Sequence, residues 1–416
     1  MTLTAVCSLS DRVMRWADAL AVHTEGNGLT CTYMTPVHTA VRTQLRAWMH
    51  ECGFDEVRVD AVGNVIGRYH ADPTIKSPRI VALGSHYDTV RNGGRYDGRL
   101  GILVPLALVA DLHAEARRLP YDLEVICFSE EEGVRFGTTF IGSTAYAGRF
   151  DLSSLSRCDR DGVPLRQALR DAGFEPNEIA QAATETQRLH HYAEIHIEQG
   201  PVLLDQDLAV GVVSGIAGNI RRRLGLVGRS DHAGTTPMHM RRDAAAAAAE
   251  IILAVERRCT GTPGLVGTVG MVDVPGGAIN VVPGHCELSV DVRAGDDALR
   301  DAAMQDIDAE IEAICRRRDI GLTQVELMRV PAVPCSDVGR ALWRGVVEQM
   351  NLPVVELPSG AGHDAMVMAA VAPMSMLFVR CGNGGISHHP DEIVAVDDVQ
   401  VAIEATRQFL FAVAPL

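Results

Sequence analysis

Long apolar runs that end abruptly in polar residues are the most regular feature of the chain. Segments 79–86 (RIVALGSH) and 123–131 (LEVICFSEE) are of this kind, and segment 100–117 between them has the pattern of a mostly apolar helix. Apolar strands that alternate with helices are typical of a parallel or mixed sheet covered by helices on both faces. We therefore predict an α/β fold in which polar residues at the carboxyl ends of the strands carry the chemistry.

The hydrophobic pattern changes near residue 217, where a differently organised segment begins. Its expected elements are an exposed strand, a helix capped by Asp243, a pair of strands and a second helix: 218–232, 244–258, 265–274 with 285–293, and Asp297–Arg318. This order predicts a compact inserted α+β domain over 218–329. Residues 1–217 and 330–416 then form one catalytic domain, which ends in a helix from Val396 to Ala412.

Composition limits the possible partners. With 416 residues, of which 47% are hydrophobic, the chain is long enough for two domains. A formal charge of -15 argues against nucleic acid as a partner. The first twenty residues lack the order of a signal peptide and predict an amphipathic helix, and no apolar stretch is long enough to span a membrane. Ten scattered cysteines without disulfide spacing favour the cytoplasm for this soluble protein.

Five separated stretches contain histidines and carboxylates that could bind a metal. In GSHYDTV, His86 and Asp88 stand two positions apart at a strand end, so one can ligate an ion while the other orients it. In NGGRYDGRLG, Asp97 lies in a glycine-rich loop eleven positions after His86. Taken alone, the pair could be a satisfied surface histidine and its neighbour, and the loop could be an ordinary turn.

The next two stretches also allow ordinary interpretations. SEEEGVRFG places three glutamates, residues 130–132, after a buried strand, where they repel one another unless cations compensate them, although a solvated loop would also accommodate them. HYAEIHIEQG places Glu194, His196 and Glu198 on one face of a strand. A partly exposed edge strand explains that alternation about as well as a functional site.

The fifth stretch, GGISHHPDE, offers His388 and His389 in a glycine-rich loop, and its residues do not decide between the two. Together the five stretches supply a mixed set of nitrogen and oxygen donors. Such a set suits zinc, manganese, cobalt or nickel. Because coincidence in five places is improbable, the sequence favours a metal site.

The motifs resemble those of a known family in both order and wording. GSHYDTV, GGRYDG, EEEGVRFG, HIEQG, SDHAGTTPM, NVVPG, DVR, SGAGHDA and SHHPDE are similar to motifs of the amidase, hydantoinase/carbamoylase branch of the dinuclear metal aminoacylase and carboxypeptidase family. That branch contains N-carbamoyl-L-amino acid hydrolases, allantoate amidohydrolases, ureidoglycolate amidohydrolases and some ureidopropionases. The resemblance covers nearly the whole chain. It implies an amidohydrolase that cleaves the ureido C–N bond of a small carboxylate such as allantoate or an N-carbamoyl-L-amino acid.

The resemblance also implies two divalent ions in each subunit, either zinc or, alternatively, manganese, cobalt or nickel. The implied ligands are His86, Asp97 and His196 for one ion, and Asp97, Glu132 and His388 for the other. Glu131 would be the general base for a metal-bridging hydroxide, and Asp88 would orient His86. His388 is preferred to His389 because the family pattern has a histidine directly after serine, and the roles of Glu131 and Glu132 could be shifted by one.

The inserted domain is implied to act as a lid and as the interface of a homodimer. His232 would stabilise the oxyanion, often from the partner subunit, and Asn280 and Arg293 would bind the substrate carboxylate. Gln199 and the loop with Gly360 and His363 are further implied substrate contacts. Without the resemblance, a core histidine, a turn asparagine and a surface ion pair would explain the first three residues.

Three other kinds of protein remain as alternatives. A metallopeptidase or aminoacylase would use the same metals on dipeptides or N-acyl amino acids, but HIEQG with Gln199 argues against it. A catalytically silent metal-binding or dimerisation protein would have lost a ligand or the base, and all of them are present. A thiol amidase needs a reactive cysteine, whereas Cys127 lies inside an apolar strand.

Overall fold

The computed structural model describes residues 8–413, and these form two compact units. The first comprises residues 8–214, 335–357 and 362–413, and the second comprises residues 215–334 and 358–361. The sequence placed the inserted domain at 218–329, and its role as a lid or dimer interface stays a prediction. In the described part of the chain, no helix combines the length and apolarity needed to cross a membrane.

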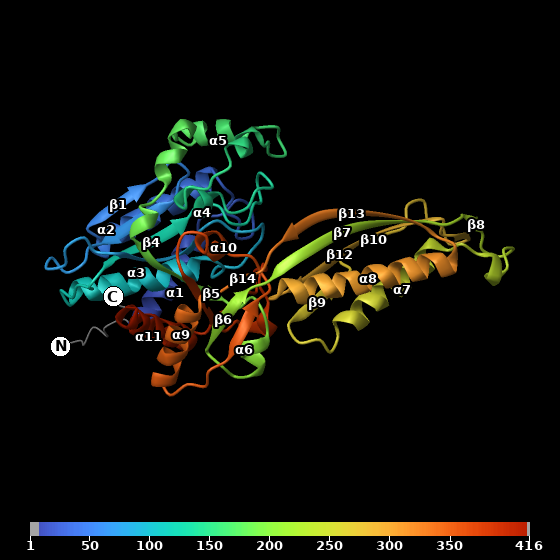
Figure 1. The fold of residues 1–416 in the computed structure, drawn as a ribbon. Helices are drawn as coiled ribbons and strands as arrows, with labels where there is room; N and C mark the ends of the chain where they lie inside the picture. Colours follow the sequence, from blue (N-terminus) through green and yellow to red (C-terminus); the bar gives the residue numbers. More distant parts are fainter. Residues whose placement is uncertain (1–7, 414–416) are drawn as a thin grey trace. The chain divides into compact units, whose positions relative to one another are not determined.

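The first unit is built around a mixed sheet (Figure 1). Its strands in spatial order are β1 (Glu56–Val59), β2 (Val65–Tyr69), β4 (Asp122–Phe128), β3 (Ile80–His86), β5 (Leu189–Ile197), β16 (Met374–Val379) and β6 (Val210–Ile216), with β15 (Glu356–Ser359) also pairing with β6. Strands β4, β3, β5 and β16 run parallel, and the neighbours at either end pair antiparallel. The two predicted buried strands are confirmed as β3 and β4, whose residues are all buried.

Helices cover both faces of this sheet, which confirms the α/β class. On one face of the sheet, side chains of β3 such as Val81 and Leu83 share an apolar core with a first group of helices, listed below. On the opposite face, the ring of Phe128 packs against Tyr146 of the second group. The first group is α1 (Leu9–Ala21), α2 (Pro36–Glu51), α3 (Arg99–Ala114), α9 (Asp337–Gln349) and α11 (Val396–Ala412); the second includes α4 (Ile141–Tyr146) and α10 (Ala365–Met368).

Two short helices complete this unit, and two of its other helices were expected from the sequence. The short helices are α5 (Leu165–Asp171) and α6 (Val202–Asp205). The amphipathic helix expected at the start of the chain is α1, which buries Val13, Ala17 and Leu20, although residues 1–7 lie outside the described residues. The final predicted helix has the bounds of α11.

The parallel strands bring three of the acidic and histidine-rich stretches to one edge of the sheet. His86 ends β3, residues 129–132 follow β4, and His196 lies one residue before the end of β5. The alternative of an exposed edge strand for HYAEIHIEQG is wrong, because β5 lies between β3 and β16 and is almost wholly buried. Glu198 lies beyond β5, where its carboxylate accepts hydrogen bonds from the first backbone N–H groups of α6.

The second unit is a sheet with two helices packed on one face. The strand order is β10 (Val272–Asp273), β12 (His285–Ala294), β7 (Gly218–Val227) and β13 (Gly321–Val330), with β9 (Leu265–Thr268) also pairing with β12. The helices are α7 (Ala244–Cys259), capped by Asp243 as expected, and α8 (Asp297–Arg318), which has the predicted bounds. A two-stranded ribbon of β8 (Asp231–His232) and β11 (Val281–Val282) completes the unit, and β14 (Val333–Pro334) pairs antiparallel with the end of β6 as the last strand of the mixed sheet.

Two expectations for this unit are corrected. Segment 218–232 does not form an exposed strand, because β7 lies between β12 and β13 and buries alternate side chains against the helices. Segment 265–274 is broken into β9 and β10 instead of forming one strand. Strand β13 is an edge strand that the hydrophobic pattern did not indicate, because nearly all its side chains are exposed.

In the first unit, His38 joins α2 to the loop that follows β4. Its Nε2 donates a hydrogen bond to the carbonyl oxygen of Ser129 at 2.7 Å, and its ring stacks on Tyr87 with the centroids 4.6 Å apart. The side chain is fully buried, and this burial lowers the pKa of His38 from 6.5 to about 4. The folded protein therefore holds the ring neutral at physiological pH.

We expect wild-type protein to lose stability relative to His38→Gln as the pH falls from about 6.5 to about 4. The unfolded chain binds a proton on this histidine below about pH 6.5, whereas the folded chain does not until about pH 4, so protonation favours unfolding by roughly 1.4 kcal/mol per pH unit in that window. Glutamine keeps a donor for Ser129 but does not titrate. Urea unfolding of both proteins across the window measures the difference, and a difference that is independent of pH contradicts the prediction.

Candidate metal centre

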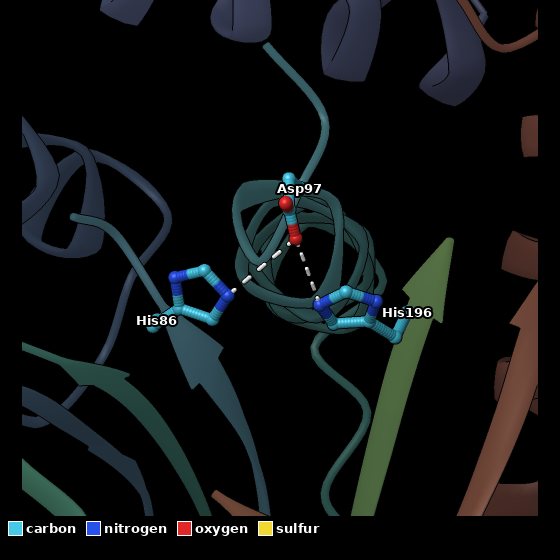
Figure 2. A group of neighbouring side chains, drawn as sticks. All are labelled: His86, Asp97 and His196. Atoms are coloured by element: carbon cyan, nitrogen blue, oxygen red, sulfur yellow. Dashed lines mark ion pairs between the residues drawn. The ribbon is translucent and has the colours of Figure 1, made fainter. Parts of the chain in front are cut away.

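Asp97 lies between two histidines at the carboxyl edge of the sheet, just before α3. Its Oδ1 is 3.6 Å from Nε2 of His86 and 3.3 Å from Nε2 of His196 (Figure 2). All three side chains are buried, and one donor atom from each lies within 4.8 Å of the others. A Cβ on Gly98, whose φ is +66°, would overlap the ring of His86, so glycine lets the chain pass this closely.

The second ring nitrogen of each histidine already has a partner. Nδ1 of His86 lies 3.2 Å from the carbonyl oxygen of Asp88 and 3.4 Å from its carboxylate, and Nδ1 of His196 lies 2.9 Å from the carbonyl oxygen of Ile197. Because oxygen acceptors attract a protonated nitrogen, Nδ1 is the nitrogen that keeps its hydrogen when either ring is neutral, and Nε2 is then free to bind an ion. Between each Nε2 and the Asp97 carboxylate lies either a proton, which makes the ring a cation, or a metal ion.

The other carboxylate oxygen of Asp97 faces a second group of donors. Nε2 of His388 lies 3.1 Å from Oδ2 of Asp97 and 3.6 Å from Oε1 of Glu132. The alternative ligand His389 instead accepts a hydrogen bond from the backbone N–H of Asp391 through Nδ1. The structure thus brings together both implied ligand sets with Asp97 common to them, while metal binding by these residues stays a prediction.

The spacing of these donor atoms fits coordination of an ion. Two ligand atoms that each lie about 2.0–2.2 Å from one zinc ion at the tetrahedral angle are separated by about 3.3–3.6 Å. Three of the four separations given above, at 3.3 to 3.6 Å, lie in this range, and the fourth, between His388 and Asp97, is 3.1 Å. The donor set of imidazole and carboxylate is also the one that first-row divalent ions prefer.

Negative charge is concentrated around this centre. The carboxylates buried there are Asp88, Asp97, Glu130, Glu131, Glu194, Asp364 and Glu392. Among the described residues of the first unit, Arg99 is the one buried lysine or arginine. Burial alone would raise the pKa of Asp97, but hydrogen bonds with its three histidine neighbours hold that pKa well below its ordinary value. Buried anions in such excess require cations, and two divalent ions would supply them.

Asp88 and Glu131 occupy the side of the centre next to β4. The Asp88 carboxylate accepts hydrogen bonds from the backbone N–H groups of Glu131 at 3.1 Å and Glu132 at 3.2 Å, so it fixes these residues as well as His86. Burial raises the pKa of Glu131 well above its ordinary value, although His86 opposes this shift. The negative charge of Glu132 raises the pKa of Glu131 further. A carboxylate with a raised pKa is a stronger base, which suits proton abstraction.

Two further predicted site residues of the first unit lie at the centre. Gln199 has a φ of +55°, and its amide donates a hydrogen bond to Oδ2 of Asp97 at 3.1 Å. His363 is buried, and its ring packs edge-on against His196 with centroids 4.4 Å apart. Burial lowers the pKa of His363, so this ring is neutral beside the donor groups.

Glu392 is among the residues at the centre that received no role from the sequence. It is buried and accepts hydrogen bonds from the backbone N–H groups of Tyr96 and Asp97. The only signal in the sequence was its place in the motif SHHPDE, four positions after His388. A glutamate in a loop of that composition is ordinarily solvated, and its contacts depend on a segment almost three hundred residues earlier.

The remaining predicted site residues lie in the second unit. His232 and Asn280 are neighbours on the ribbon, because His232 pairs with Val281 and the N–H of Ala233 donates to the carbonyl oxygen of Asn280 at 2.9 Å. Both residues are exposed. The interpretation of His232 as a core histidine is therefore wrong.

Arg293 lies near the far end of β12 from the ribbon. Its guanidinium binds both carboxylate oxygens of Asp291, at 3.0 and 2.8 Å, and donates to the carbonyl oxygen of Gly360 at 2.7 Å. The side chain is 30% exposed and lines a pocket together with Arg221, Leu327 and Gly360. The pocket and the predicted contacts Arg293 and Gly360 thus occur together within this unit.

The thiol alternative finds no support at Cys127. This side chain is fully buried within β4, and burial raises the pKa of its thiol well above the ordinary value. A thiol in that environment is neither accessible nor ionised, so it cannot serve as a nucleophile.

Comparison with known proteins gives consistent results. The profile of peptidase family M20/M25/M40 matches residues 82–412. An N-carbamoyl-L-amino acid amidohydrolase of Geobacillus stearothermophilus is 37% identical over 91% of this chain and 91% of its own length, and an allantoate deiminase of Arabidopsis thaliana is 36% identical over 91% and 77%. The crystal structure of an amidase of the hydantoinase/carbamoylase family from Burkholderia multivorans superposes with a TM-score of 0.90 at 30% identity, covering 98% of both chains.

Proposed function

Because this chain belongs to peptidase family M20/M25/M40 and, within it, to the hydantoinase/carbamoylase amidases, we propose that it hydrolyses the ureido C–N bond of a small carboxylate. The observation that carries the proposal is the pair of donor groups that share Asp97. The relatives named above act on N-carbamoyl-L-amino acids or on allantoate. Both kinds of compound combine a ureido group with a carboxylate, and this combination defines the substrate class.

The family is a dinuclear, metal-dependent one, and the residues around Asp97 suit two divalent ions. We assign one ion to His86, Asp97 and His196, and the other to Asp97, Glu132 and His388. Zinc is the first choice and manganese, cobalt or nickel the alternatives, because the donors mix imidazole with carboxylate. Ions bound there would polarise the ureido carbonyl and lower the pKa of water to near neutrality.

Side chains of the first unit would then transfer the protons and hold the metal ligands in place. Glu131, whose pKa is raised by burial, accepts the proton of the attacking water and passes it to the departing nitrogen. Asp88 keeps Nδ1 of His86 protonated and holds the backbone of Glu131 in place. Gln199 donates to Asp97 and so fixes the carboxylate that both donor groups use.

The substrate carboxylate is assigned to the second unit. Arg293 keeps a partly exposed guanidinium at a pocket, and Asn280 and His232 stand exposed on the ribbon. A guanidinium binds a carboxylate through two parallel hydrogen bonds. We assign carboxylate binding to Arg293 and Asn280, with Gly360 and His363 as further contacts, and oxyanion stabilisation to His232.

Geometry within the second unit favours a homodimer. The ribbon with His232 adjoins the beginning of β12 at His285, whereas Arg293 lies eight residues further along that strand, or about 26 Å at 3.3 Å per residue. One small substrate cannot reach both residues of a single chain. A solution mass twice that of the 44.8 kDa chain is expected, and a monomer in an active preparation would contradict it.

We propose a reducing compartment, the cytoplasm, for this protein on the basis of its cysteines. The nine cysteines among the described residues are all free, and eight of them are buried. An oxidising compartment would expose the remaining thiol, Cys158, to oxidation and intermolecular pairing.

A substrate panel tests the reaction class. The metal-supplied protein is incubated with allantoate, ureidoglycolate, N-carbamoyl-L-amino acids, N-carbamoyl-β-alanine, N-acyl amino acids and dipeptides, and ammonia and free amino acids are both measured. We expect ammonia from at least one ureido acid and no cleavage of dipeptides. Cleavage of dipeptides or N-acyl amino acids without ammonia would move the protein to the metallopeptidase or aminoacylase alternative.

A further inference from the structure

Glu392 connects two loops that are remote in sequence and that each carry a predicted metal ligand. Its Oε1 accepts hydrogen bonds from the backbone N–H groups of Tyr96 at 2.9 Å and Asp97 at 3.2 Å. Its Oε2 accepts a hydrogen bond from the hydroxyl of Ser387 at 2.8 Å. Asp97 follows Tyr96 directly, and His388 follows Ser387 directly. One carboxylate therefore holds the backbone on which the side chains of Asp97 and His388 approach each other.

The glycine-rich loop before Asp97 is shaped around this carboxylate. A Cβ built on Gly94 would overlap all three atoms of the Glu392 carboxylate group. Gly94 has no positive φ, so its own backbone conformation does not require glycine. The position needs glycine because the carboxylate fills the space that a side chain would take. This contact is independent of the hydrogen bonds and identifies the same partner.

A second connection closes the network on the ligand side. The Gln199 amide donates to Oδ2 of Asp97 at 3.1 Å and to the hydroxyl of Ser387 at 3.3 Å. Ser387 is thus bound by both Glu392 and Gln199. The same two side chains hold Asp97: Glu392 binds its backbone N–H, and Gln199 binds its carboxylate. His388 has a φ of +54°, a conformation that a non-glycine residue keeps only where its surroundings hold it.

A general structural role does not explain why a buried polar side chain occupies this position. Glu392 is 1% exposed and lies beside the buried negative charge of Asp97, which is an unfavourable place for an anion. Its three hydrogen-bond donors all belong to the loops that hold Asp97 and His388. The free-energy cost of burying the Glu392 carboxylate is therefore offset by hydrogen bonds to the loops that carry the predicted ligands Asp97 and His388.

Building on the proposed metal-dependent function, we infer that Glu392 is a positioning residue that fixes Asp97 against His388 and so preassembles the group Asp97, Glu132 and His388 for the second ion. The group formed with His86 and His196 depends on it less, because those histidines are held by β3 and β5. Loss of Glu392 should therefore weaken the second ion selectively.

The test is calorimetric titration of zinc ion into chelator-treated wild type, Glu392→Ala, Glu392→Gln and Gly94→Ala. We expect wild type to bind two ions, and Glu392→Ala to lose about 10–100-fold in affinity for one of them, as when a group that supports a metal ligand is removed. Gly94→Ala should reproduce this loss by displacing the carboxylate. Glu392→Gln should retain most of the affinity, because its amide oxygen can accept both N–H groups while its amide nitrogen donates to Ser387.

A double variant separates positioning from general damage. In Glu392→Ala the space beside Gly94 is vacated, so adding Gly94→Ala should cause no further loss of zinc affinity. Asp122→Ala is the matched control, because Asp122 is also a buried carboxylate that accepts a backbone N–H, from Ala71, but it lies at the other end of β4. It should lower stability without changing the zinc stoichiometry.

Three results would overturn the inference. They are two ions bound by Glu392→Ala with wild-type affinities, additive losses in the double variant, or equal weakening of both ions. If wild type itself bound no zinc, the proposed function would fail instead, so the two failures are distinguishable. Thermal unfolding of the metal-free variants checks that each one folds.

Discussion

Replacing Glu131 by glutamine is expected to reduce turnover of the ureido substrate by about 10²–10⁴-fold, the usual contribution of a general base. Glutamine has nearly the same shape but cannot take up a proton at neutral pH. Glu131 lies beside His86 and Glu132, and its backbone is held by Asp88, so the substitution should leave the other donors in place. The kinetic loss should appear in kcat, whereas the zinc content should stay at two ions per chain.

Glu124→Gln is the matched control for this substitution. Glu124 is another buried glutamate of the same segment, but its carboxylate binds Arg68 and Tyr146 at the far end of β4. This variant should be less stable but should keep its kcat. Undiminished turnover by Glu131→Gln would exclude Glu131 as the base and would favour the shifted assignment to its neighbours.

Replacing Asp97 by asparagine is expected to have the largest effect on metal binding. Oδ1 faces His86 and His196, whereas Oδ2 faces His388, so each predicted ion uses a different oxygen of the same carboxylate. Asparagine offers one oxygen and no negative charge. We expect zinc affinity to fall by more than about 100-fold for at least one ion, beyond the loss typical of a supporting residue, and turnover to become undetectable.

Zinc content after dialysis and activity measured on the same samples check this expectation. Asp391→Asn is a suitable control, because Asp391 lies in the same motif as His388 and is exposed, but it contacts His389. That variant should resemble wild type. Two tightly bound ions in Asp97→Asn would contradict the assignment of a shared carboxylate.

Sequence reasoning succeeded where one physical signal dominated. Strands β3 and β4 were predictable because a short, wholly apolar run that ends in polar residues is typical of a buried strand. Helix α8 was predictable to its bounds because Asp296 caps its start and three arginines occupy its last turn. The fold class followed from the alternation of such elements, and the comparisons confirm it.

Elements whose environment depends on distant partners were harder to predict. Strand β7 was expected to be exposed, but it lies between β12 and β13. The alternation of side chains along a strand does not indicate whether neighbouring strands cover both of its edges. Strand β13 was missed because its side chains are exposed along most of its length. Residues 358–361 join the second unit through contacts such as the bond from the N–H of Ala217 to the carbonyl oxygen of Ser359, which no local pattern indicates.

The candidate metal centre was also predictable only in part. The five histidine and acidic stretches were visible in the sequence, but each one alone allowed an ordinary structural interpretation. Only the resemblance of their order to a known family favoured one specific set of metal ligands. That Asp97 is shared, and that His388 rather than His389 approaches it, are facts of geometry. Glu392 acts through backbone N–H groups that every residue except proline has, so the identity of its partners could not be predicted.

The most direct test of the central claim is a titration of activity with metal. The protein is stripped with a chelator, zinc or manganese is returned in known equivalents, and ammonia release from the best ureido acid is measured at each point. We predict no turnover without metal, and full turnover only as the second equivalent binds to each chain. Ammonia release that persists in the stripped protein, or that is complete after a single equivalent, would contradict a reaction that depends on two ions held around Asp97.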